Sequence, residues 1–339
     1  MVMRTRFVMS SGNSMSSNDE HRESGGKTTG HTTVLLHEAI EQLGIKPDDI
    51  VVDATLGGAG HATAIAESLG KGGVLIGMDL DQDAIERAKI ALEKFSKPKI
   101  HLATANFRNL SSEIAKLGVT QIGKALFDLG WSGYQLSAGR GFSFSAKGGS
   151  ASGGKDEPLL MTYSANPSES TLTAAMIVNE WAEESIADII FGWGEERYSR
   201  RIAKRIVEAR AKTPIRTSLQ LAEIIRGAVP PAYRHGRIHP ATRTFQALRI
   251  AVNDELGALK EGLAGAWANL SQGGRIAVIT FHSIEDREVK RLFLKWEKMG
   301  EGKRITRSPI RASTEEIKVN PRARSAKLRV IEKTQDNVK

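Results

Sequence analysis

Small side chains follow an acidic residue near the start of the chain, where the sequence at residues 51–62 reads VVDATLGGAGHA. Gly57, Gly58 and Gly60 allow a backbone to approach a ligand closely, and the free amide groups of a helix starting there would face that ligand. A tight turn that only joins a strand to a helix would account for the same glycines. The segment therefore raises a nucleotide site as a hypothesis that needs support from the residues downstream.

Asp79 provides this support, because it ends a second apolar run at residues 74–78 just as Asp53 follows the run at residues 50–52. In a parallel α/β fold, the acid that ends the second strand accepts the ribose hydroxyls of a nucleotide bound at the first turn. The dinucleotide fingerprint G-x-G-x-x-G is incomplete, since Thr63 stands where its third glycine is required. Two strand-end acids and a loose glycine turn favour S-adenosylmethionine as the cofactor over NAD.

Two more apolar runs end in residues that can contact a ligand. After residues 100–104, Asn106 and Phe107 are placed to meet the edge and the face of an adenine; packing in the core is the alternative for Phe107. Asp128 ends the run at residues 125–127. Polar and aromatic residues follow it at once: Trp131, Ser132, Tyr134 and Gln135. Because ligands bind beyond the carboxyl ends of such strands, the four strand ends together predict one site.

These strand ends require an α/β, Rossmann-like sheet, and the middle of the chain interrupts that pattern. A Gly/Ser/Lys loop leads into helical sequence with apolar stripes at Ile186, Ile189 and Ile190 and at Ile202, Ile206 and Val207. A long helix is expected at residues 241–263, and a strand is expected in GGRIAVITFHS. We therefore expect a small all-α domain inserted in a methyltransferase-type domain. The predicted boundaries are a disordered tail at 1–30, a discontinuous methyltransferase domain at 31–135 and 236–339, and an inserted loop and helical substrate-recognition domain at 136–235.

The composition is that of a soluble globular protein. The chain has 339 residues, 40% hydrophobic and 26% charged, which is enough for two domains and a large core. It contains no cysteine, which excludes disulfides and thiolate metal sites and is compatible with a reducing cytoplasm. We see neither an apolar stretch of membrane-spanning length nor a secretory signal in the first 30 residues. We expect a cytoplasmic protein, and the sequence leaves open whether it is a monomer or a homodimer.

The charge indicates a polyanionic partner. The formal net charge is +9 and the pI is near 9.6, with the basic residues densest at 197–210 and 303–329. Phosphate contacts dominate nucleic-acid binding, so this excess favours RNA as the partner. Arg197, Tyr198, Arg200 and Arg201 make the helical insertion a candidate RNA-facing surface, although an exposed helix with charge pairs would look similar.

Several longer segments resemble one family, the bacterial 16S ribosomal RNA cytosine-N4 methyltransferases, from His31 to about Val330. The resemblance rests on HTTVLLHEAI, DATLGGAGH, MDLDQDAI, DLGWSGYQL, RGFSF, GEERYSRRIAKRIV, HPATRTFQALRIAVNDEL, GGRIAVITFHSIEDREVKR and NPRARSAKLRV. The last four are long and unlike generic methyltransferase sequence. The resemblance implies S-adenosylmethionine-dependent methylation of the N4 amine of one cytidine, in the decoding region of 16S ribosomal RNA in the small ribosomal subunit.

The resemblance also implies which residues form the site. Cofactor contacts are implied at Ala59, Gly60, His61, Asp79, Phe107, Asp128 and Gln135. The methyl group of a sulfonium is already activated, so the reaction requires no metal, only a weak amine nucleophile held in line with it. Asp128 and Ser132 are candidates to accept the hydrogens of that amine. Trp131 or Tyr134 is a candidate platform for a base taken out of its stack, with core packing as the alternative for Trp131.

Two departures from the family keep another function open. Relatives read Val-Ser-Ser where this chain has Trp131, Ser132 and Gly133, and they read PLDMRM where residues 158–163 are PLLMTY. An acid and an arginine are thus missing from a segment expected to shape the substrate pocket. The alternatives are a non-catalytic ribosome assembly or RNA-binding factor of the same fold and, less consistent with the motifs, a nicotinamide-dependent dehydrogenase. For His282, which precedes Glu285, we favour a helix cap or an RNA contact over catalysis.

Overall fold

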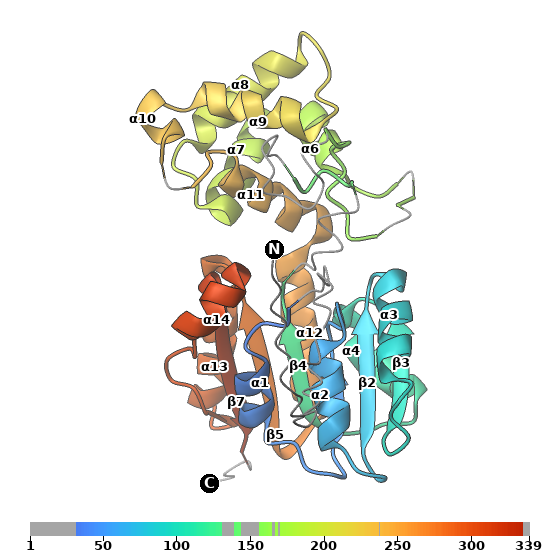
Figure 1. Cartoon of the computed structure of the whole chain (residues 1–339). Helices are drawn as coiled ribbons and strands as arrows, with labels where there is room; N and C mark the ends of the chain where they lie inside the picture. The colour runs from blue at the N-terminus through green and yellow to red at the C-terminus, as the bar shows by residue number, and fades with distance from the viewer. Residues whose placement is uncertain are drawn as a thin grey trace, which may run out of the picture. The chain divides into compact units, whose positions relative to one another are not determined.

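The structure is a computed structural model that describes residues 32–130, 139–143, 156–164, 167–168, 170–236 and 238–334. The described residues belong to one compact unit. Seven strands among them form a single sheet (Figure 1). The strands are β1 (Ile50–Asp53), β2 (Val74–Asp79), β3 (Lys99–Thr104), β4 (Ile122–Asp128), β5 (Leu270–Thr280), β6 (Gly302–Arg304) and β7 (Lys327–Lys333). Strands were expected from the sequence at β1 to β5, and all five are present.

The strand order is β3-β2-β1-β4-β5-β7-β6. Strands β1 to β5 run parallel, whereas β7 pairs antiparallel with both β5 and β6. The order of the strands reverses between β1 and β4. In a doubly wound sheet, this reversal opens a crevice at the carboxyl ends of the two strands, where ligands bind. The expected α/β, Rossmann-like fold class is therefore confirmed.

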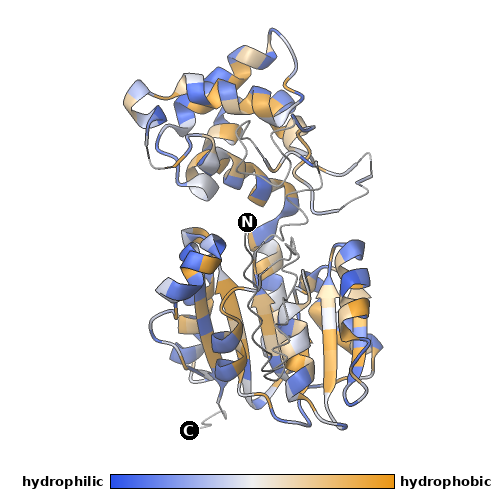
Figure 2. Ribbon diagram, viewed as in Figure 1, coloured by the Kyte–Doolittle hydropathy of each residue, from blue (hydrophilic) through white to orange (hydrophobic). Residues whose placement is uncertain are grey.

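Alternate side chains of each central strand enter two different cores. Val51 and Leu126 pack with one set of helices, and their chain neighbours Val52 and Phe127 pack with another. Successive side chains of a strand point to opposite faces, so a strand covered on both faces must be apolar along its length. Figure 2 shows this as strands that are mainly orange, the colour of hydrophobic residues.

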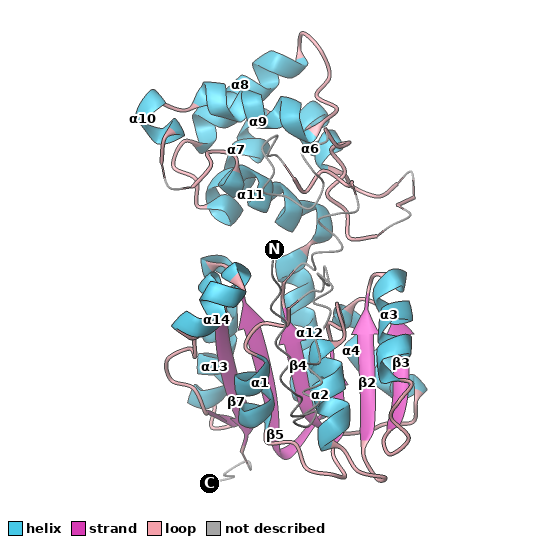
Figure 3. Cartoon of the chain, in the orientation of Figure 1, coloured by secondary structure: helices cyan, strands magenta, loops and turns pink. Residues whose placement is uncertain are grey.

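Helices cover both faces of the sheet (Figure 3). One face carries α1 (Leu36–Leu43), α2 (Gly60–Ser68) and α3 (Gln82–Leu92), with α14 (Thr314–Val319) and the short helix η2 (Pro321–Ser325) at the β7 side. The other face carries η1 (Phe107–Asn109), α4 (Leu110–Lys116), α12 (Glu255–Asn269) and α13 (Ser283–Lys298). This arrangement leaves the carboxyl edge of the sheet uncovered by these helices, which is where the predicted site residues lie.

The helices inserted between β4 and α12 have a core of their own. They are α6 (Ala174–Glu180), α7 (Glu183–Gly194), α8 (Ser199–Arg210), α9 (Ser218–Ala228), α10 (Pro231–Arg234) and α11 (Thr242–Asn253). Ile186, Ile190, Ile202 and Ile206 are completely buried among them, as the apolar stripes predicted. Phe142, Leu159 and Met161 join the same core, so we call the described part of residues 139–253 the helical cluster.

One expectation about the helices is wrong. Instead of a single helix over residues 241–263, α11 ends at Asn253 and α12 begins at Glu255, with Asp254 between them in the left-handed region at φ 46° and ψ 45°. The two halves have different partners: Leu248 packs in the helical cluster, whereas Leu263 packs on the sheet.

Among the described residues, no helix is both long and apolar enough to span a bilayer.

Candidate active site

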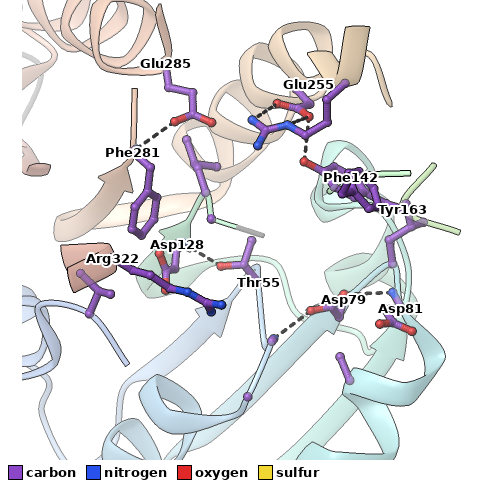
Figure 4. Close-up of a pocket in the computed structure, with 18 of the residues that line it drawn as sticks. Thr55, Asp79, Asp81, Asp128, Phe142, Tyr163, Glu255, Phe281, Glu285 and Arg322 are labelled. Atoms are coloured by element: carbon purple, nitrogen blue, oxygen red, sulfur yellow. Dashed lines mark hydrogen bonds and ion pairs between the residues drawn. The ribbon is translucent and has the colours of Figure 1, made fainter. Parts of the chain in front are cut away.

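A cavity of about 700 Å³ is lined by the residues that follow β1, β2, β4 and β5 and by residues of the helical cluster. Figure 4 shows the acids Asp79 and Asp128 at this cavity, with Tyr163 of the helical cluster on its wall. The strand ends that the sequence predicted to form one site are thus brought together. Trp131, Ser132, Tyr134 and Gln135 lie outside the described residues, so the roles expected for them stay predictions.

The glycine turn after β1 brings the backbone of Gly57, Gly58 and Gly60 to the wall of the cavity. Ala59, the N-cap residue of α2, has left-handed backbone (φ 62°) and provides no side-chain hydrogen bond to the helix. A Cβ atom on Gly60 would lie 1.8 Å from Thr33 Oγ1, so any other residue there would displace the Thr33 side chain. Gly60 and His61 line the cavity, while the Ala59 side chain is buried beneath the turn. The first amide groups of α2 are therefore uncapped by side chains at the edge of the cavity.

Asp79 is fixed by backbone donors at the end of β2. Its Oδ2 accepts a hydrogen bond of 2.8 Å from Gly57 N, and its Oδ1 accepts one of 2.9 Å from Asp81 N. Burial raises the pKa of Asp79 from its usual value. Each carboxylate oxygen can accept more than one hydrogen bond, so the two oxygens remain able to bind vicinal hydroxyls. This geometry suits the ribose role predicted for Asp79.

Asp53 is fully buried and the side chain of Asp128 is 15% exposed, and each of these acids has an unsatisfied oxygen. Among the described residues, neither Asp53 Oδ2 nor Asp128 Oδ1 has a hydrogen-bond partner, and His61 Nδ1 lies 3.6 Å from Asp128 Oδ2. Burial foremost, and then the nearby charges of Asp53 and Glu285, raise the pKa of Asp128 to about 8. Burial likewise raises the pKa of Asp53 to about 7. A positively charged group of a ligand would stabilise the ionised forms of these two acids and could bind their unsatisfied oxygens.

These features fit S-adenosylmethionine. Asp79 would hold its ribose, the unsatisfied acids would attract the ammonium of its amino-acid tail, and the glycine turn brings backbone to the wall of the cavity. Phe107 lines the cavity and also packs edge-on against Phe127, with ring centroids 5.7 Å apart. Core packing and a place beside the adenine are thus compatible for Phe107, and its cofactor role stays a prediction.

An aromatic wall from the helical cluster lines the opposite part of the cavity. The rings of Phe142 and Tyr163 are stacked at 6.0 Å with an interplanar angle of 21°, and Phe245 of α11 lines the same cavity. Met161 lies between them in sequence with left-handed backbone (φ 58°), and its carbonyl accepts a hydrogen bond from Asn253 Nδ2. Flat apolar surfaces of this kind accommodate a nucleobase taken out of its stack.

A buried ionic network lies beside this wall, and the sequence did not reveal it. Arg249 Nε donates to Glu255 Oε1 at 2.7 Å, and the Tyr163 hydroxyl donates to the same oxygen at 2.7 Å. Although burial disfavours the charged guanidinium, Glu255 raises the pKa of Arg249 above its usual value. Burial also raises the pKa of Tyr163 well above 10, so Tyr163 remains a donor. The segment at residues 158–163, whose sequence differs from that of relatives, thus contributes the Tyr163 hydroxyl to this network.

His282 begins the next helix, as the sequence predicted. It is the N-cap residue of α13, and its Nδ1 accepts a hydrogen bond from Glu285 N at 3.3 Å in a capping box. Glu255, His282 and Glu285 offer ligand atoms within 4.8 Å of one another. Because Arg249 already provides the positive charge at Glu255, we assign no metal to this cluster.

Some of the basic residues expected to face RNA instead form ion pairs with acids of the protein. Arg329 is buried, and its Nε lies 2.6 Å from Asp286 Oδ1, while Lys327 Nζ lies 3.0 Å from Asp286 Oδ2. Arg200 pairs with Asp188 on the surface of the helical cluster. The expectation that the whole segment 303–329 faces phosphate is therefore wrong at Arg329. Its exposed basic residues are Lys303, Arg307, Arg311, Lys318, Arg322 and Arg324.

The doubly wound sheet, the glycine turn and the strand-end acids define a Rossmann-like methyltransferase. Residues 28–334 match the MraW methylase family, and the chain belongs to that family. A ribosomal RNA small subunit methyltransferase H from Brevibacillus brevis is 45% identical over 319 residues, which cover 89% of this chain and 98% of the relative. The protein of the same name from Deinococcus radiodurans is 46% identical over 312 residues, 92% of each chain. The chain is thus a methyltransferase with S-adenosylmethionine as its cofactor.

Proposed function

We propose that this enzyme methylates the N4 amine of a cytidine in the decoding region of 16S ribosomal RNA. Relatives 45–46% identical to it are named ribosomal RNA small subunit methyltransferases. The observation that carries the proposal is the position of Asp128. Asp128 lines the same cavity as Asp79 and Gly60, the predicted cofactor contacts, and as the aromatic residues Phe142 and Tyr163. A nucleobase stacked on the aromatic wall would lie near Asp128, at the end of the cavity expected to hold the amino-acid tail of S-adenosylmethionine.

The residues around Asp128 suit attack by a weak amine. The bound cofactor supplies an activated methyl group. The lone pair of a cytosine amine is delocalised into the ring, and an acceptor for its N–H groups favours the pyramidal nitrogen that attacks. The nitrogen must lose one proton as its new bond to carbon forms. Because the ammonium of the bound cofactor would hold Asp128 in its ionised form, this carboxylate would be able to take that proton. Ser132 and Trp131 stay proposed as a second acceptor and a base platform.

The helical cluster supplies the substrate side of the cavity. We propose that residues 136–235 serve as the substrate-recognition domain, inserted in a methyltransferase domain at residues 31–135 and 236–339. Beyond residue 235, α11 packs in the core of the helical cluster, so we group it with the substrate side. Arg197 and Arg201 are exposed, and their guanidinium groups lie 4.8 Å and 5.9 Å from the ring of Tyr198. We further propose 16S ribosomal RNA in the small ribosomal subunit as the partner, met in the cytoplasm. The net charge of +9 supports a polyanionic partner.

The test compares Asp128→Ala with the unsubstituted enzyme, using labelled S-adenosylmethionine and small ribosomal subunits that lack the modification. We expect Asp128→Ala to abolish methyl transfer and to leave RNA affinity and its salt dependence nearly intact. Asp83→Ala is the matched control, because Asp83 is an exposed acid in the first turn of α3. Retained transfer by Asp128→Ala would remove Asp128 from the reaction. Binding without transfer by the unsubstituted protein would instead indicate a non-catalytic RNA-binding factor.

A further inference from the structure

We infer that Arg322 binds the carboxylate of the S-adenosylmethionine tail, an inference that rests on the methyltransferase function. Arg322 belongs to η2 and lines the cavity, although it is far in sequence from the predicted cofactor contacts. It is exposed, and no hydrogen bond or ion pair of its guanidinium is found among the described residues. A cation at a ligand cavity without a protein partner is available to an anionic group of the ligand.

Hydrogen bonds and packing place η2 beside the start of α2. Asn320, the N-cap residue of η2, donates from Nδ2 to Thr32 O at 3.1 Å and accepts from Arg322 N at 3.3 Å. Thr33, which follows Thr32 in the chain, lies against Gly60, the first residue of α2. Arg322 is thereby held near the uncapped amide groups of α2, which themselves favour an anion.

The direction of the bound cofactor follows from the acids. Figure 4 shows Arg322 extending into the cavity on the side of Asp128, across from Asp79 and Tyr163. With the ribose at Asp79, the amino-acid tail would run toward Asp128 and Arg322. The ammonium and carboxylate of the tail share one carbon atom. An ammonium held by Asp128 therefore brings the carboxylate into an acidic environment, where it needs a cation.

The other basic side chains that line the described part of the cavity face carboxylates of the protein. Arg249 is bound to Glu255, His282 Nε2 lies 3.0 Å from Glu285 Oε1, and His61 faces Asp128. This leaves the guanidinium of Arg322 to balance the carboxylate of the tail. A planar guanidinium can donate two parallel hydrogen bonds to a carboxylate, which adds orientation to charge.

The experiment measures dissociation constants by isothermal titration calorimetry for S-adenosylmethionine and for decarboxylated S-adenosylmethionine, which lacks only the carboxylate. We expect Arg322→Ala to weaken S-adenosylmethionine binding about tenfold, a value reduced for solvent exposure, and to leave binding of the decarboxylated compound unchanged. Arg324→Ala is the matched control, because Arg324 is an exposed arginine of η2 that does not line the cavity. It should change neither constant.

Equal weakening of both compounds by Arg322→Ala would overturn the inference, because it would indicate a general disturbance of the pocket. Unchanged constants for both would also overturn it, and a simultaneous loss of RNA affinity would then assign Arg322 to a phosphate. If the unsubstituted protein bound neither compound, the methyltransferase function itself would be contradicted. The three failures are thus distinguishable without measuring methyl transfer.

Discussion

The hydroxyl of Tyr163 donates a hydrogen bond of 2.7 Å to Glu255 Oε1, and so connects the helical cluster to the first residue of α12. Arg249 holds the same carboxylate with two bonds, of 2.7 Å and 3.0 Å. Glu255 directly follows the left-handed residue Asp254, where α11 and α12 separate. Tyr163 thus secures the aromatic wall of the cavity at the junction of the two helices.

Replacing Tyr163 by phenylalanine tests this connection. The ring stacked on Phe142 is kept, while Glu255 loses one of its donors and keeps Arg249. We expect the free energy of unfolding of Tyr163→Phe to fall by about 1 kcal/mol, the usual net contribution of one hydrogen bond. The measurement is urea-induced unfolding, with Tyr198→Phe as the control, because no hydrogen bond of the Tyr198 hydroxyl is found among the described residues. Equal stability of Tyr163→Phe and the unsubstituted protein would show that the bond does not form.

Asp79 offers a test of how the cofactor is held. We expect Asp79→Ala to weaken S-adenosylmethionine binding by about 1.5 to 3 kcal/mol, as for the loss of a charged hydrogen-bond acceptor. Part of this effect would come through Gly57, whose backbone amide is held by Asp79. Calorimetric titration gives the dissociation constant, and Asp83→Ala should leave it unchanged. An unaltered constant for Asp79→Ala would remove Asp79 from the site.

The raised pKa of Asp128 predicts a pH dependence of cofactor binding. In the free protein this acid is largely protonated below its pKa of about 8, and burial is the main cause. The ammonium of the cofactor's tail favours the ionised acid, so binding releases a proton below that pKa. Affinity should therefore increase from about pH 6 to about pH 7.5, by at most about tenfold per pH unit for one proton.

Asp128→Asn provides the control for this pH series, since an amide does not titrate. Its dissociation constant for S-adenosylmethionine should vary less with pH than that of the unsubstituted protein. Calorimetry in two buffers of different ionisation enthalpy would measure the released proton directly. Affinity that falls as the pH rises, or the same pH dependence in Asp128→Asn, would contradict the role of this acid.

The exposed basic residues of the C-terminal region should bind RNA phosphate. Arg307, Arg311 and Lys318 are exposed, in contrast to the ion-paired and buried Arg329. We expect the triple substitution of these three residues by glutamine to weaken RNA binding and to reduce the slope of log affinity against log salt by about 2, at roughly 0.7 per phosphate contact with single-stranded RNA. Thermal stability should change little.

Arg329→Met is the contrasting variant, because Asp286 would lose one of its two cations inside the protein. It should lower the thermal stability and leave the salt slope unchanged. A salt slope that the triple glutamine variant does not alter would show that this surface does not contact RNA.

The sequence predicted the parts of the site that depend on short-range patterns. Apolar runs that end in Asp53, Asp79 and Asp128 form parallel strands, and the carboxyl ends of such strands meet at one edge of the sheet. The N-cap position of His282 could also be predicted from the sequence, since a polar residue three positions before a glutamate is typical of a helix start.

Features that depend on distant contacts were not predicted. The sequence around Asp254 continues the pattern of a helix, and the break appears because the two sides pack in different cores. The bond from Tyr163 to Glu255 joins residues 92 positions apart. Charge density indicated that residues 303–329 are basic, but it could not show that Asp286 takes up Arg329 and Lys327.

The most direct test of the proposed function is to map the nucleotide that this enzyme modifies. Unmethylated small ribosomal subunits are incubated with the enzyme and S-adenosylmethionine carrying a labelled methyl group, and the 16S ribosomal RNA is digested and analysed by mass spectrometry. We predict label on the N4 atom of a single cytidine in the decoding region, and none with Asp128→Ala. Label on a ring carbon, on a ribose or on another base, or no label with the unsubstituted enzyme, would contradict the proposed function.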